Sequence, residues 1–587
     1  MYKNLKARLT KSEKSIDSNA GVLDSSDAET EVGIQEIEDL TADLSHNSPE
    51  IVLDNNYSQK ESSIVPVKKQ KVKILSVAKV QNKASESRQV QNLEDALRSN
   101  NLSPLKVLEY FARVSPDSVA IINEKRVLTF QQLNSIVRQF AIKFKDSGIE
   151  PGDFVVTKLP VTIDWISTLA LMSIGAITCS KSGRAAVDSS FDARFLISDG
   201  SLIWQSTETI ILSDSWLHEA EHLDPNQLIE PQLNFDSASR VIFTNGTLSS
   251  PKAVALSLKG LNERINQSNR TWLNEKSVMT LMDLSSGLGF FTFYSLFVRG
   301  EKIVTTSQFN LDAVRMAISQ GIEVFVASTM RVIQVMELIK RTQSSLPKLR
   351  KVIISGNIPT LAVLQSVDKS LGVEVFNVYG SIECGDVSLL PVNSKAEPGD
   401  MGWIYPETQV RIVNAKNEAV GLGMPGRIAT RTTSMVNQYF RTAKPNLKVF
   451  EDGWFFSGDI GYLTEDGRLI ITGRESELIP IGKLKVNSHS IEELVLDYAG
   501  VVDCAAFAFT SRSKEPSLGV AIVGDKDLNL KLMTTSLARE LGEMAPTRYF
   551  VTDSIPRDIN GKVQKALLLD ALSKKIVDKN KGQGEAQ

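Results

Sequence analysis

The loop Thr244–Lys252 has a composition suited to gripping an anion. It is packed with Thr, Gly and Ser, ends in a lysine, and lies between the apolar runs Val241–Phe243 and Ala253–Leu256. Small residues let backbone N–H groups converge on an anion, while hydroxyls add donors and lysine adds charge. The Walker A spacing G-x-x-x-x-G-K-[ST] is absent. The loop therefore predicts either a phosphate site or an ordinary hairpin turn.

A second group of residues, Phe376–Glu383, follows a predicted strand. An aromatic side chain beside a glycine, as at Tyr379–Gly380, can stack on a base at the carboxyl end of a strand. A carboxylate placed just beyond, as at Glu383, can hold Mg²⁺ on a nucleotide. The alternative is a core tyrosine and a solvated glutamate.

Two later turns carry further chemistry. Gly453–Asp459 and Gly467–Arg474 place Asp459 where a carboxylate could accept both hydroxyls of a ribose, although two surface hairpins would look the same. Near the C-terminus, the turn Pro556–Val563 presents Lys562, which by itself would be a solvated charge.

Composition limits the classes of partner. The 587 residues include 66 basic and 69 acidic ones, so the net charge of −3 gives no global attraction to nucleic acid. Three cysteines, far apart in the sequence, argue against a disulfide framework and suit a reducing compartment. No apolar segment follows Met1–Thr10, and the uncharged stretch Trp165–Ser180 is too short to span a bilayer. We expect a cytoplasmic protein without a membrane span, and we interpret Trp165–Ser180 as a buried helix and strand.

The first 95 residues are polar and nearly free of aromatic side chains. Such a segment cannot bury enough apolar surface to offset its ordering entropy, so we expect a disordered N-terminal extension. Within it, Ile64–Val80 mixes branched apolar residues with lysines, which fits either a solvated tail or a docking segment for a protein partner.

Strand-like and helix-like runs alternate from residue 96 to residue 474, which predicts an α/β domain. The predicted helix is Gln131–Ser147, and the predicted strands are Asp117–Ile122, Val127–Phe130, Phe154–Leu159, Gly300–Thr305, Val324–Ala327, Leu349–Ser355 and Val373–Val378. Residues 475–587 predict a smaller α+β domain. Its strands are Val501–Phe509 and Leu518–Val523, and its helices are Val486–Tyr498, with a capping box at Ser490 and Glu493, and Asn529–Leu541, with Asn529 as N-cap.

In this order and spacing, the motifs resemble the adenylate-forming superfamily of acyl-CoA synthetases, beetle luciferases and peptide-synthetase adenylation domains. The resemblance runs from about residue 95 to 575 and includes Ser115–Asp117 and Leu128–Leu133. It implies a large multi-layer α/β adenylating domain and a small mobile α+β lid that rotates about a hinge near Ser476. It also implies that a carboxylate attacks the α-phosphorus of ATP, giving acyl-AMP and pyrophosphate, before a thiol takes the acyl group.

The resemblance implies a role for each motif residue. Phosphate binding would fall to Thr244, Asn245, Gly246, Thr247 and Lys252, and Mg²⁺ binding to Glu383 and Thr247. The adenine slot would be lined by Ser355, Gly356, Asn357, Tyr379, Gly380 and Ser381, and the ribose held by Asp459 and Arg474. The acid pocket would include Ser285, Ser286, Gly287 and Gly380, while Lys562 on the lid would act in catalysis with Thr244 and Glu383. ATP, Mg²⁺, a small carboxylic acid and either CoA or a phosphopantetheine carrier protein would be the implied ligands.

The sequence departs from the family pattern at several positions. In the phosphate loop, usually close to T-S-G-T-T-G-x-P-K-G, Asn245, Ser249 and Ala253 replace Ser, Gly and Gly, which predicts a weaker phosphate grip. Ser285 stands where a His or an aromatic residue gates the acid, and Pro480 stands at a usual lysine of the pantetheine channel. The acceptor is therefore left open between CoA and a carrier protein.

Two alternatives to the acid–thiol ligase remain at this stage. Met282–Ser285 superficially resembles the amino-group-binding signature of peptide synthetases, which would make the chain a stand-alone amino-acid adenylation enzyme. The altered phosphate loop would also suit a nucleotide-binding partner protein that has lost its chemistry.

Overall fold

The structure is a computed structural model, and the residues it describes are 95, 99, 101–181, 192–204, 207–244, 252–271, 275–306, 310–356, 359, 361–393, 396–441, 449–475, 478–481, 484–496, 498–510, 516–557 and 563–572. Apart from Asp95, the predicted N-terminal extension lies outside these ranges, and so does its segment Ile64–Val80.

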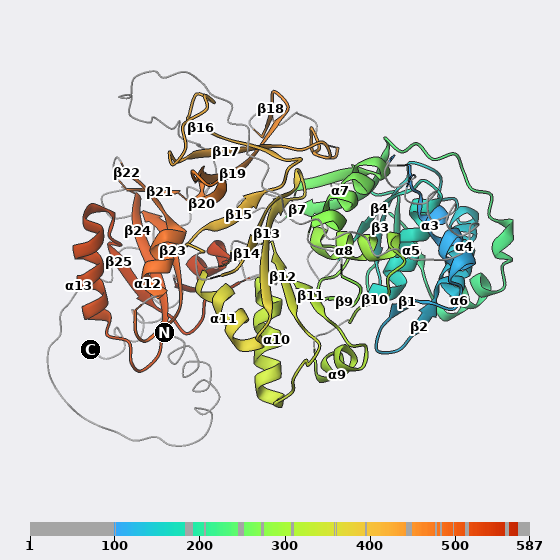
Figure 1. The fold of residues 1–587 in the computed structure, drawn as a ribbon, viewed down its shortest axis with the longest axis horizontal. Helices are drawn as coiled ribbons and strands as arrows, with labels where there is room; N and C mark the ends of the chain where they lie inside the picture. The colour runs from blue at the N-terminus through green and yellow to red at the C-terminus, as the bar shows by residue number, and fades with distance from the viewer. Residues whose placement is uncertain are drawn as a thin grey trace, which may run out of the picture.

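A six-stranded sheet carries the predicted phosphate loop (Figure 1). Its order is β6 (Glu208–Ile211), β5 (Phe195–Ser198), β3 (Phe154–Lys158), β4 (Ile177–Ser180), β7 (Ala238–Thr244) and β8 (Lys252–Ser257). All neighbours run parallel except β7 and β8, which form an antiparallel pair. Because parallel strands end at one edge of a sheet, Thr244 lies at the carboxyl edge, where ligands of such sheets bind.

A larger, 14-stranded mixed sheet fills the middle of the molecule. Its order is β16 (Gln409–Val413), β17 (Gly426–Arg431), β19 (Trp454–Leu463), β20 (Arg468–Arg474), β15 (Asp400–Ile404), β14 (Gly385–Pro391), β13 (Glu374–Ser381), β12 (Lys351–Ser355), β11 (Val324–Ala327), β9 (Val278–Thr280), β10 (Ile303–Val304), β1 (Val119–Ile122) and β2 (Val127–Thr129), with β18 (Phe450–Glu451) beside β19. The strands from β13 to β1 are parallel, so the residues that follow β9, β12 and β13 meet at one edge.

Helices pack on both sheets. The helices of the N-terminal domain are α3 (Pro104–Val114), α4 (Phe130–Asp146), α5 (Val161–Ser173), α6 (Asp214–Glu221), α7 (Leu258–Thr271), α8 (Gly287–Val298), α9 (Leu311–Ser319), α10 (Thr329–Thr342) and α11 (Leu361–Leu371), with a 3-10 turn at Pro225–Gln227. Figure 1 shows α7 and α8 between the two sheets, while α9, α10 and α11 accompany β9–β13.

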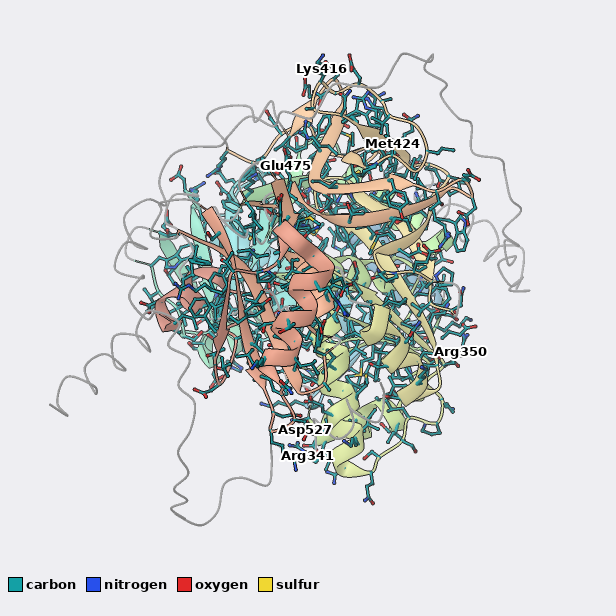
Figure 2. All side chains as sticks on the ribbon, turned by 90° about the vertical axis from the view of Figure 1, so that its left-hand side faces the viewer. Arg341, Arg350, Lys416, Met424, Glu475 and Asp527 are labelled. Atoms are coloured by element: carbon teal, nitrogen blue, oxygen red, sulfur yellow. The ribbon has the colours of Figure 1, made fainter. Side chains whose placement is uncertain are left out.

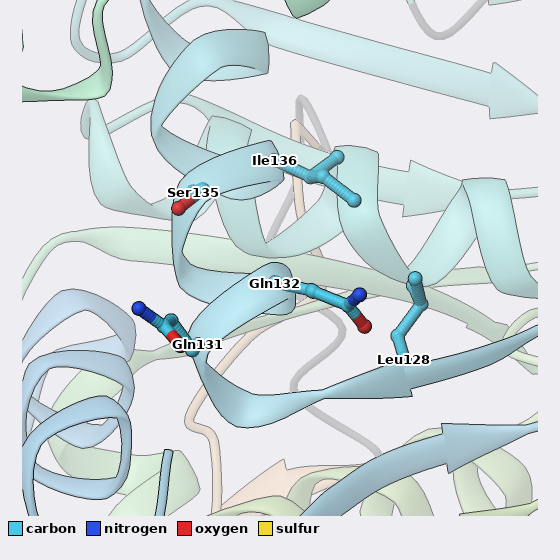
Figure 3. Close-up of a pocket in the computed structure, with 5 residues that line it drawn as sticks. All are labelled: Leu128, Gln131, Gln132, Ser135 and Ile136. Atoms are coloured by element: carbon cyan, nitrogen blue, oxygen red, sulfur yellow. The ribbon is translucent and has the colours of Figure 1, made fainter. Parts of the chain in front are cut away.

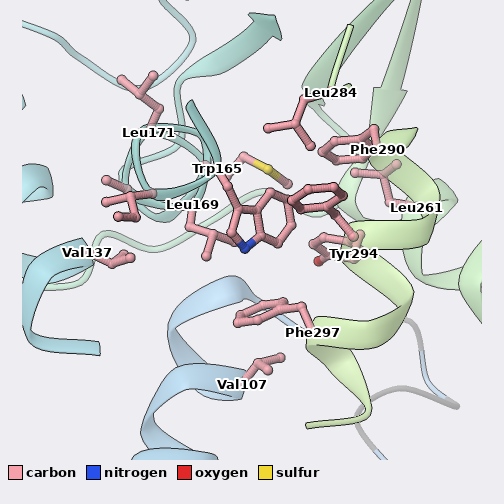
Figure 4. Close-up of a cluster of buried hydrophobic side chains, with 14 of the residues drawn as sticks. Val107, Val137, Trp165, Leu169, Leu171, Leu261, Leu284, Phe290, Tyr294 and Phe297 are labelled. Carbon is pink, nitrogen blue, oxygen red and sulfur yellow. The ribbon is translucent and has the colours of Figure 1, made fainter. Parts of the chain in front are cut away.

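The largest core cluster joins the two sheets through α5 and α8. Trp165, from α5, is fully buried against three phenylalanines of α8, with ring centroids 6.2 Å from Phe290, 5.4 Å from Phe293 and 5.7 Å from Phe297 (Figure 4). Such aromatic pairs each contribute about 0.5–1.5 kcal/mol beyond the area they bury. The helix whose first turn approaches the site is therefore anchored along its length.

A separate small domain follows residue 475. It consists of the hairpin β21 (Leu478–Ile481) and β22 (Leu484–Asn487), the sheet β23 (Val501–Thr510), β24 (Pro516–Gly524) and β25 (Arg548–Val551), the helices α12 (Ser488–Leu496) and α13 (Leu530–Leu541), and a 3-10 turn at Gly542–Met544. Its own core cluster includes Val495, Leu518 and Val520. Figure 2 shows Glu475, the last described residue before the domain, where the two parts of the ribbon meet. The fold is thus mixed α/β, with a large sheet-rich N-terminal domain and a small C-terminal one.

The predicted elements are largely confirmed, with corrections to their bounds and caps. The predicted helix Val486–Tyr498 begins only at Ser488, because Val486 and Asn487 belong to β22, and the predicted strand Gly300–Thr305 is limited to β10, Ile303–Val304. The predicted capping box is wrong, because α12 begins at Ser488 and Ser490 already lies inside the helix, whereas Asn529 caps α13 by accepting the Leu532 N–H. The predicted strand Val373–Val378 is also too short. As β13 it continues to Ser381, because those residues pair with β14.

The uncharged stretch Trp165–Ser180 is a buried helix and strand, as predicted, since it forms most of α5 and all of β4. Among the described residues, no helix is both long enough and apolar enough to cross a bilayer.

Candidate active site

The predicted phosphate loop connects two paired strands. Thr244, the last residue of β7, pairs with Lys252, the first residue of β8, so the loop begins and ends at one point of the sheet edge. Asn245, Gly246, Thr247 and Ser249 lie outside the described residues. Ala253 is buried, and its carbonyl accepts the Phe440 N–H at 2.7 Å. This bond ties the base of the hairpin to the segment that carries Tyr439.

Tyr439 connects the predicted phosphate hairpin, formed by β7 and β8, with the predicted metal ligand Glu383. The Lys252 ammonium lies 4.8 Å from the centre of the Tyr439 ring, and the Tyr439 hydroxyl donates to Glu383 Oε1 at 2.9 Å. Burial, followed by the Glu383 carboxylate, raises the pKa of Tyr439, so its hydroxyl stays protonated and remains a donor. Lys252, Tyr439 and Glu383 thus form one continuous chain of contacts.

The predicted ribose site is a closed hydrogen-bonded cluster. Asp459 in β19 pairs in register with Arg474 in β20, and Arg474 Nε donates to Asp459 Oδ1 at 2.7 Å. The Tyr379 hydroxyl donates to the other oxygen, Oδ2, at 2.6 Å. Burial, followed by the Asp459 carboxylate, raises the pKa of Tyr379 well above its usual value. A carboxylate has about four lone-pair sites, so each oxygen of Asp459 keeps capacity for a further donor.

The adenine-slot residues meet where two parallel strands end. Ser355 closes β12 and pairs with Val378 of β13, which places it beside Tyr379. Gly356 follows with φ +115°, a conformation that favours glycine. Gly380 lies in the strand itself, and a Cβ there would collide with the Gly385 carbonyl. Ser381 Oγ accepts the Cys384 N–H at 3.1 Å, which shapes the turn that holds Glu383, and Asn357 lies outside the described residues.

The predicted acid-pocket segment begins α8. It contacts the predicted metal turn, Ser381–Cys384, which holds Glu383. Ser286 is the N-cap of α8, because its hydroxyl accepts the Gly289 N–H at 3.1 Å. Gly287 packs so tightly against Ile382 that a Cβ would overlap that side chain. Ser285 N donates to Asp283 Oδ1 at 3.0 Å, and so does its hydroxyl. The segment predicted to contact the acid therefore packs against Ile382, the residue directly before Glu383.

A buried charged network supports this segment, and the sequence reasoning missed it. Arg240 in β7 is fully buried, donates to the Leu284 carbonyl, and lies 4.5 Å from the centre of the Phe290 ring. Asp164 in α5 is also buried. Burial raises the pKa of Asp164, and the charge of Arg240 opposes that rise. A charged residue inside an apolar strand is the signal that could have identified Arg240.

The small C-terminal domain, the predicted lid, contacts the large domain beside the predicted ribose cluster. Asn487, at the end of β22, donates to the Thr472 carbonyl, and its amide lies against Gly473, which has φ +154°. Pro480 stands in β21, paired with Lys485 of β22. Lys562 and Ser476 lie outside the described residues, although Arg557 and Val563 on either side of the lysine's turn pair with each other.

The predicted site residues that are described therefore gather at the sheet edges. A surface groove of about 350 Å³ lies elsewhere, lined by Leu128, Gln131, Gln132, Ser135 and Ile136 (Figure 3). None of the predicted site residues lines it.

One protein-family model matches most of the N-terminal domain. The model of the AMP-binding enzyme family fits residues 108–440, which is more than half of the 587-residue chain. The chain belongs to the AMP-binding enzyme family. This confirms the resemblance to adenylate-forming enzymes on which the site prediction rests.

This AMP-binding enzyme has curated relatives of very different length. It is 24% identical over 529 residues to chalcone synthase cfoA from Aspergillus candidus, in an alignment that covers 80% of this chain and 19% of that longer protein. It is 23% identical over 502 residues to 4-chlorobenzoate–CoA ligase from an Arthrobacter species, covering 81% of this chain and 96% of the relative.

A solved structure supports the fold. The complex of o-succinylbenzoate CoA synthetase from Bacillus subtilis with its acyl-adenylate superposes with a TM-score of 0.69 at 19% identity, over 79% of this chain and 97% of that one. The same protein has been solved with ATP and a magnesium ion. At this identity the likeness shows that the AMP-binding enzyme shares the fold.

The residues present fit a magnesium nucleotide. Tyr439 occupies only Oε1 of Glu383, and within the described residues Oε2 accepts no hydrogen bond. Among the described residues no group of three or more His, Cys, Asp or Glu converges. Mg²⁺ in nucleotide sites is commonly held by one or two carboxylates together with the phosphates, so one available carboxylate oxygen beside a phosphate hairpin suits it.

Proposed function

We propose that this AMP-binding enzyme activates a small or hydrophobic carboxylic acid with ATP, forming an acyl-adenylate and pyrophosphate, and then passes the acyl group to a pantetheine thiol. The observation that carries the proposal is the meeting of two clusters at the sheet edges. One is the chain Lys252–Tyr439–Glu383, and the other is Tyr379–Asp459–Arg474. The first suits triphosphate with its metal, and the second suits a nucleoside.

The first half-reaction brings two anions together, so it needs positive charge and fixed donors. Lys252 supplies a cation at the end of the phosphate hairpin, and Thr244, Asn245, Gly246 and Thr247 supply hydroxyls and backbone N–H groups. Glu383 and Thr247 would hold Mg²⁺, which neutralises charge on the phosphates when bound. Tyr439 holds one oxygen of the Glu383 carboxylate in place.

The nucleoside would bind across the ends of β12, β13 and β19. Asp459 would accept hydrogen bonds from the ribose hydroxyls, while Arg474 and Tyr379 hold the Asp459 carboxylate in place. The adenine base would bind to Ser355, Gly356, Asn357 and the Tyr379–Ser381 strand.

The acid would enter beside Ser285, Ser286 and Gly287. Gly380, in the neighbouring strand, would line the same pocket. We assign residues 96–474 to the adenylating domain and 475–587 to the lid. Lys562, on the lid, would bridge the acid and the α-phosphate when the lid closes, and rotation near Ser476 would then admit the thiol.

For the acceptor we propose CoA, with a phosphopantetheine carrier protein as the other thiol source, because two of the relatives described here are CoA ligases. We place the enzyme in the cytoplasm, where its three buried thiols would stay reduced. The N-terminal extension would dock a protein partner.

The two alternatives are not favoured. Asp283, which would bind an amino group, already accepts two hydrogen bonds from Ser285 and interacts electrostatically with buried Arg240. A partner protein without chemistry would not need Lys252, Glu383 and Lys562 to persist together.

The test is substrate-dependent ATP–pyrophosphate exchange with a panel of fatty, aryl and amino acids. We expect exchange with a carboxylic acid that lacks an amino group. ATP binding without exchange for any acid would overturn the proposal, and exchange confined to amino acids would replace it. Lys562→Ala should abolish exchange and leave ATP binding intact, and exchange at the wild-type rate would show that the lysine is misassigned.

A further inference from the structure

We propose that Arg264 is a positioning residue that holds the Glu383 turn in the geometry required to bind the metal–nucleotide complex. This inference rests on the metal role proposed for Glu383. It assigns a function to a side chain that belongs to none of the sequence motifs.

Arg264 is a buried clamp on main-chain carbonyls. Its exposed fraction is 5%, and its guanidinium donates to Ile382 O at 2.7 Å, to Glu383 O at 3.3 Å and to Ser434 O at 3.0 Å. Burial lowers the pKa of Arg264 to about 10, so it still carries its charge at neutral pH. Burying a cation is costly, and here the three carbonyls offset that cost by fixing two loops to one helix.

The clamp acts on the main chain, while Tyr439 acts on the side chain. Glu383 O also accepts the Val436 N–H at 2.9 Å, so the residue is held through its carbonyl by two donors and through Oε1 by a third. With its backbone and one carboxylate oxygen fixed, Glu383 presents its other oxygen in one direction. Such preorganisation lowers the cost of binding a cation, because few groups are left to order.

Arg264 also connects the metal turn to the other parts of the site. It lies in α7, which begins immediately after β8, the strand that starts at Lys252. Figure 1 shows α7 between the six-stranded sheet and the β13–β14 end of the large sheet. Its guanidinium lies 5.7 Å from the centre of the Phe291 ring in α8, the helix that begins at the acid segment. One side chain thus contacts the Glu383 turn and the helix that begins at the acid segment, from a helix that directly follows the phosphate hairpin.

The same face of α7 offers a matched control. Ser268, one turn after Arg264, is similarly buried and donates to Asp386 Oδ2 at 2.9 Å, on the same β13–β14 hairpin but beyond the Glu383 turn. A variant at Ser268 weakens the attachment of the hairpin to α7 without touching the carbonyls of Ile382 or Glu383. It therefore separates loss of stability from loss of positioning.

The experiment measures Mn²⁺ binding to the full chain by electron paramagnetic resonance, in the presence of a non-hydrolysable ATP analogue. Nucleotide binding without metal and the thermal midpoint are measured in parallel. We expect Arg264→Met to weaken Mn²⁺ binding about tenfold, which corresponds to about 1.4 kcal/mol. Arg264→Lys, which keeps the charge but not the fork, should weaken it about threefold and serves as the test if the methionine variant does not fold.

Ser268→Ala should lower the thermal midpoint while leaving Mn²⁺ affinity within about twofold. Unchanged Mn²⁺ affinity in the Arg264 variants, or an equal loss in Ser268→Ala, would overturn the positioning role. Equal weakening of metal-free nucleotide binding would do the same. If the wild-type chain binds Mn²⁺ and nucleotide but no acid supports ATP–pyrophosphate exchange, the proposed function fails and this inference stands. If it binds no Mn²⁺ with nucleotide, the inference fails.

Discussion

Gly473→Ala is the most informative test of how the lid docks on the core. Gly473 precedes Arg474 and has φ +154°, a conformation that L side chains rarely adopt. A Cβ at this position would come within 3.0 Å of all three heavy atoms of the Asn487 amide. That amide donates to the Thr472 carbonyl from the lid hairpin. The substitution should therefore push the lid hairpin away from the core.

The magnitude follows from two contributions. An alanine in this backbone conformation costs about 1–3 kcal/mol. Displacing the Asn487 amide loses one hydrogen bond, about 0.5–1.5 kcal/mol. The docked state should lose about 1.5–4.5 kcal/mol, whereas Asn487→Ala alone should lose only about 1 kcal/mol. In the double variant the hydrogen bond is lost once and the collision is gone, so it should dock no worse than Gly473→Ala.

The assay is trypsin cleavage at Arg474 and Lys485, which flank the connection between the domains. Its rate reports the undocked population when reclosing is fast. We expect cleavage at least tenfold faster in Gly473→Ala, a small increase in Asn487→Ala and no further increase in the double variant. Cleavage of Gly473→Ala at the wild-type rate would refute this account of docking. So would a rate increase in the double variant that equals the combined increases of the two single variants.

Three further predictions concern the interior of the site. Tyr439→Phe keeps the ring but removes the donor to Glu383, so the KM for ATP with Mg²⁺ in the exchange assay should rise about tenfold, and an unchanged KM would contradict the proposed chain. Asp459→Asn should raise the KM for ATP about tenfold to a hundredfold, because hydrogen bonds to a charged acceptor are lost. Arg240→Met should lower the unfolding free energy at pH 7 by about 1–3 kcal/mol, because the buried Leu284 carbonyl loses its donor and buried Asp164 loses an opposing charge. Since burial already raises the pKa of Asp164 and Arg240 opposes that rise, the folded variant gains a proton as pH falls, and urea denaturation should show a smaller deficit at pH 5 than at pH 7.

The sequence was sufficient for features that are local in the chain. The hairpin around the phosphate loop could be predicted because apolar runs flank a loop of small residues, and β7 and β8 pair there. Asn529 could be predicted as a cap because an N-cap is recognised within four residues. The pairing of Asp459 with Arg474 follows from two strands joined by a short turn.

The remaining features depend on contacts that no local pattern encodes. Arg264 acts on carbonyls 118 to 170 residues away, and a main-chain carbonyl has no signature in the sequence. Tyr439 stands 56 residues from Glu383 in an irregular segment, where a tyrosine looks like any other buried aromatic residue. The capping box at Ser490 failed for the opposite reason, since a correct local pattern was overridden when α12 began directly after β22.

The position of β1 and β2 at the end of the large sheet has a consequence for synthesis of the chain. β1 pairs with β2 and, in parallel, with β10, whose residues Ile303 and Val304 follow about 170 residues later. Ribosomes add roughly 5–20 residues per second, so the first hairpin waits roughly 10–35 s for its partner strand. During that time Ile121 and Ile122, buried in the finished sheet, have no β10 to pair with. The strands β1 and β2 are therefore made well before β10 but join the large sheet late, so their apolar faces stay unpaired with β10 during much of synthesis.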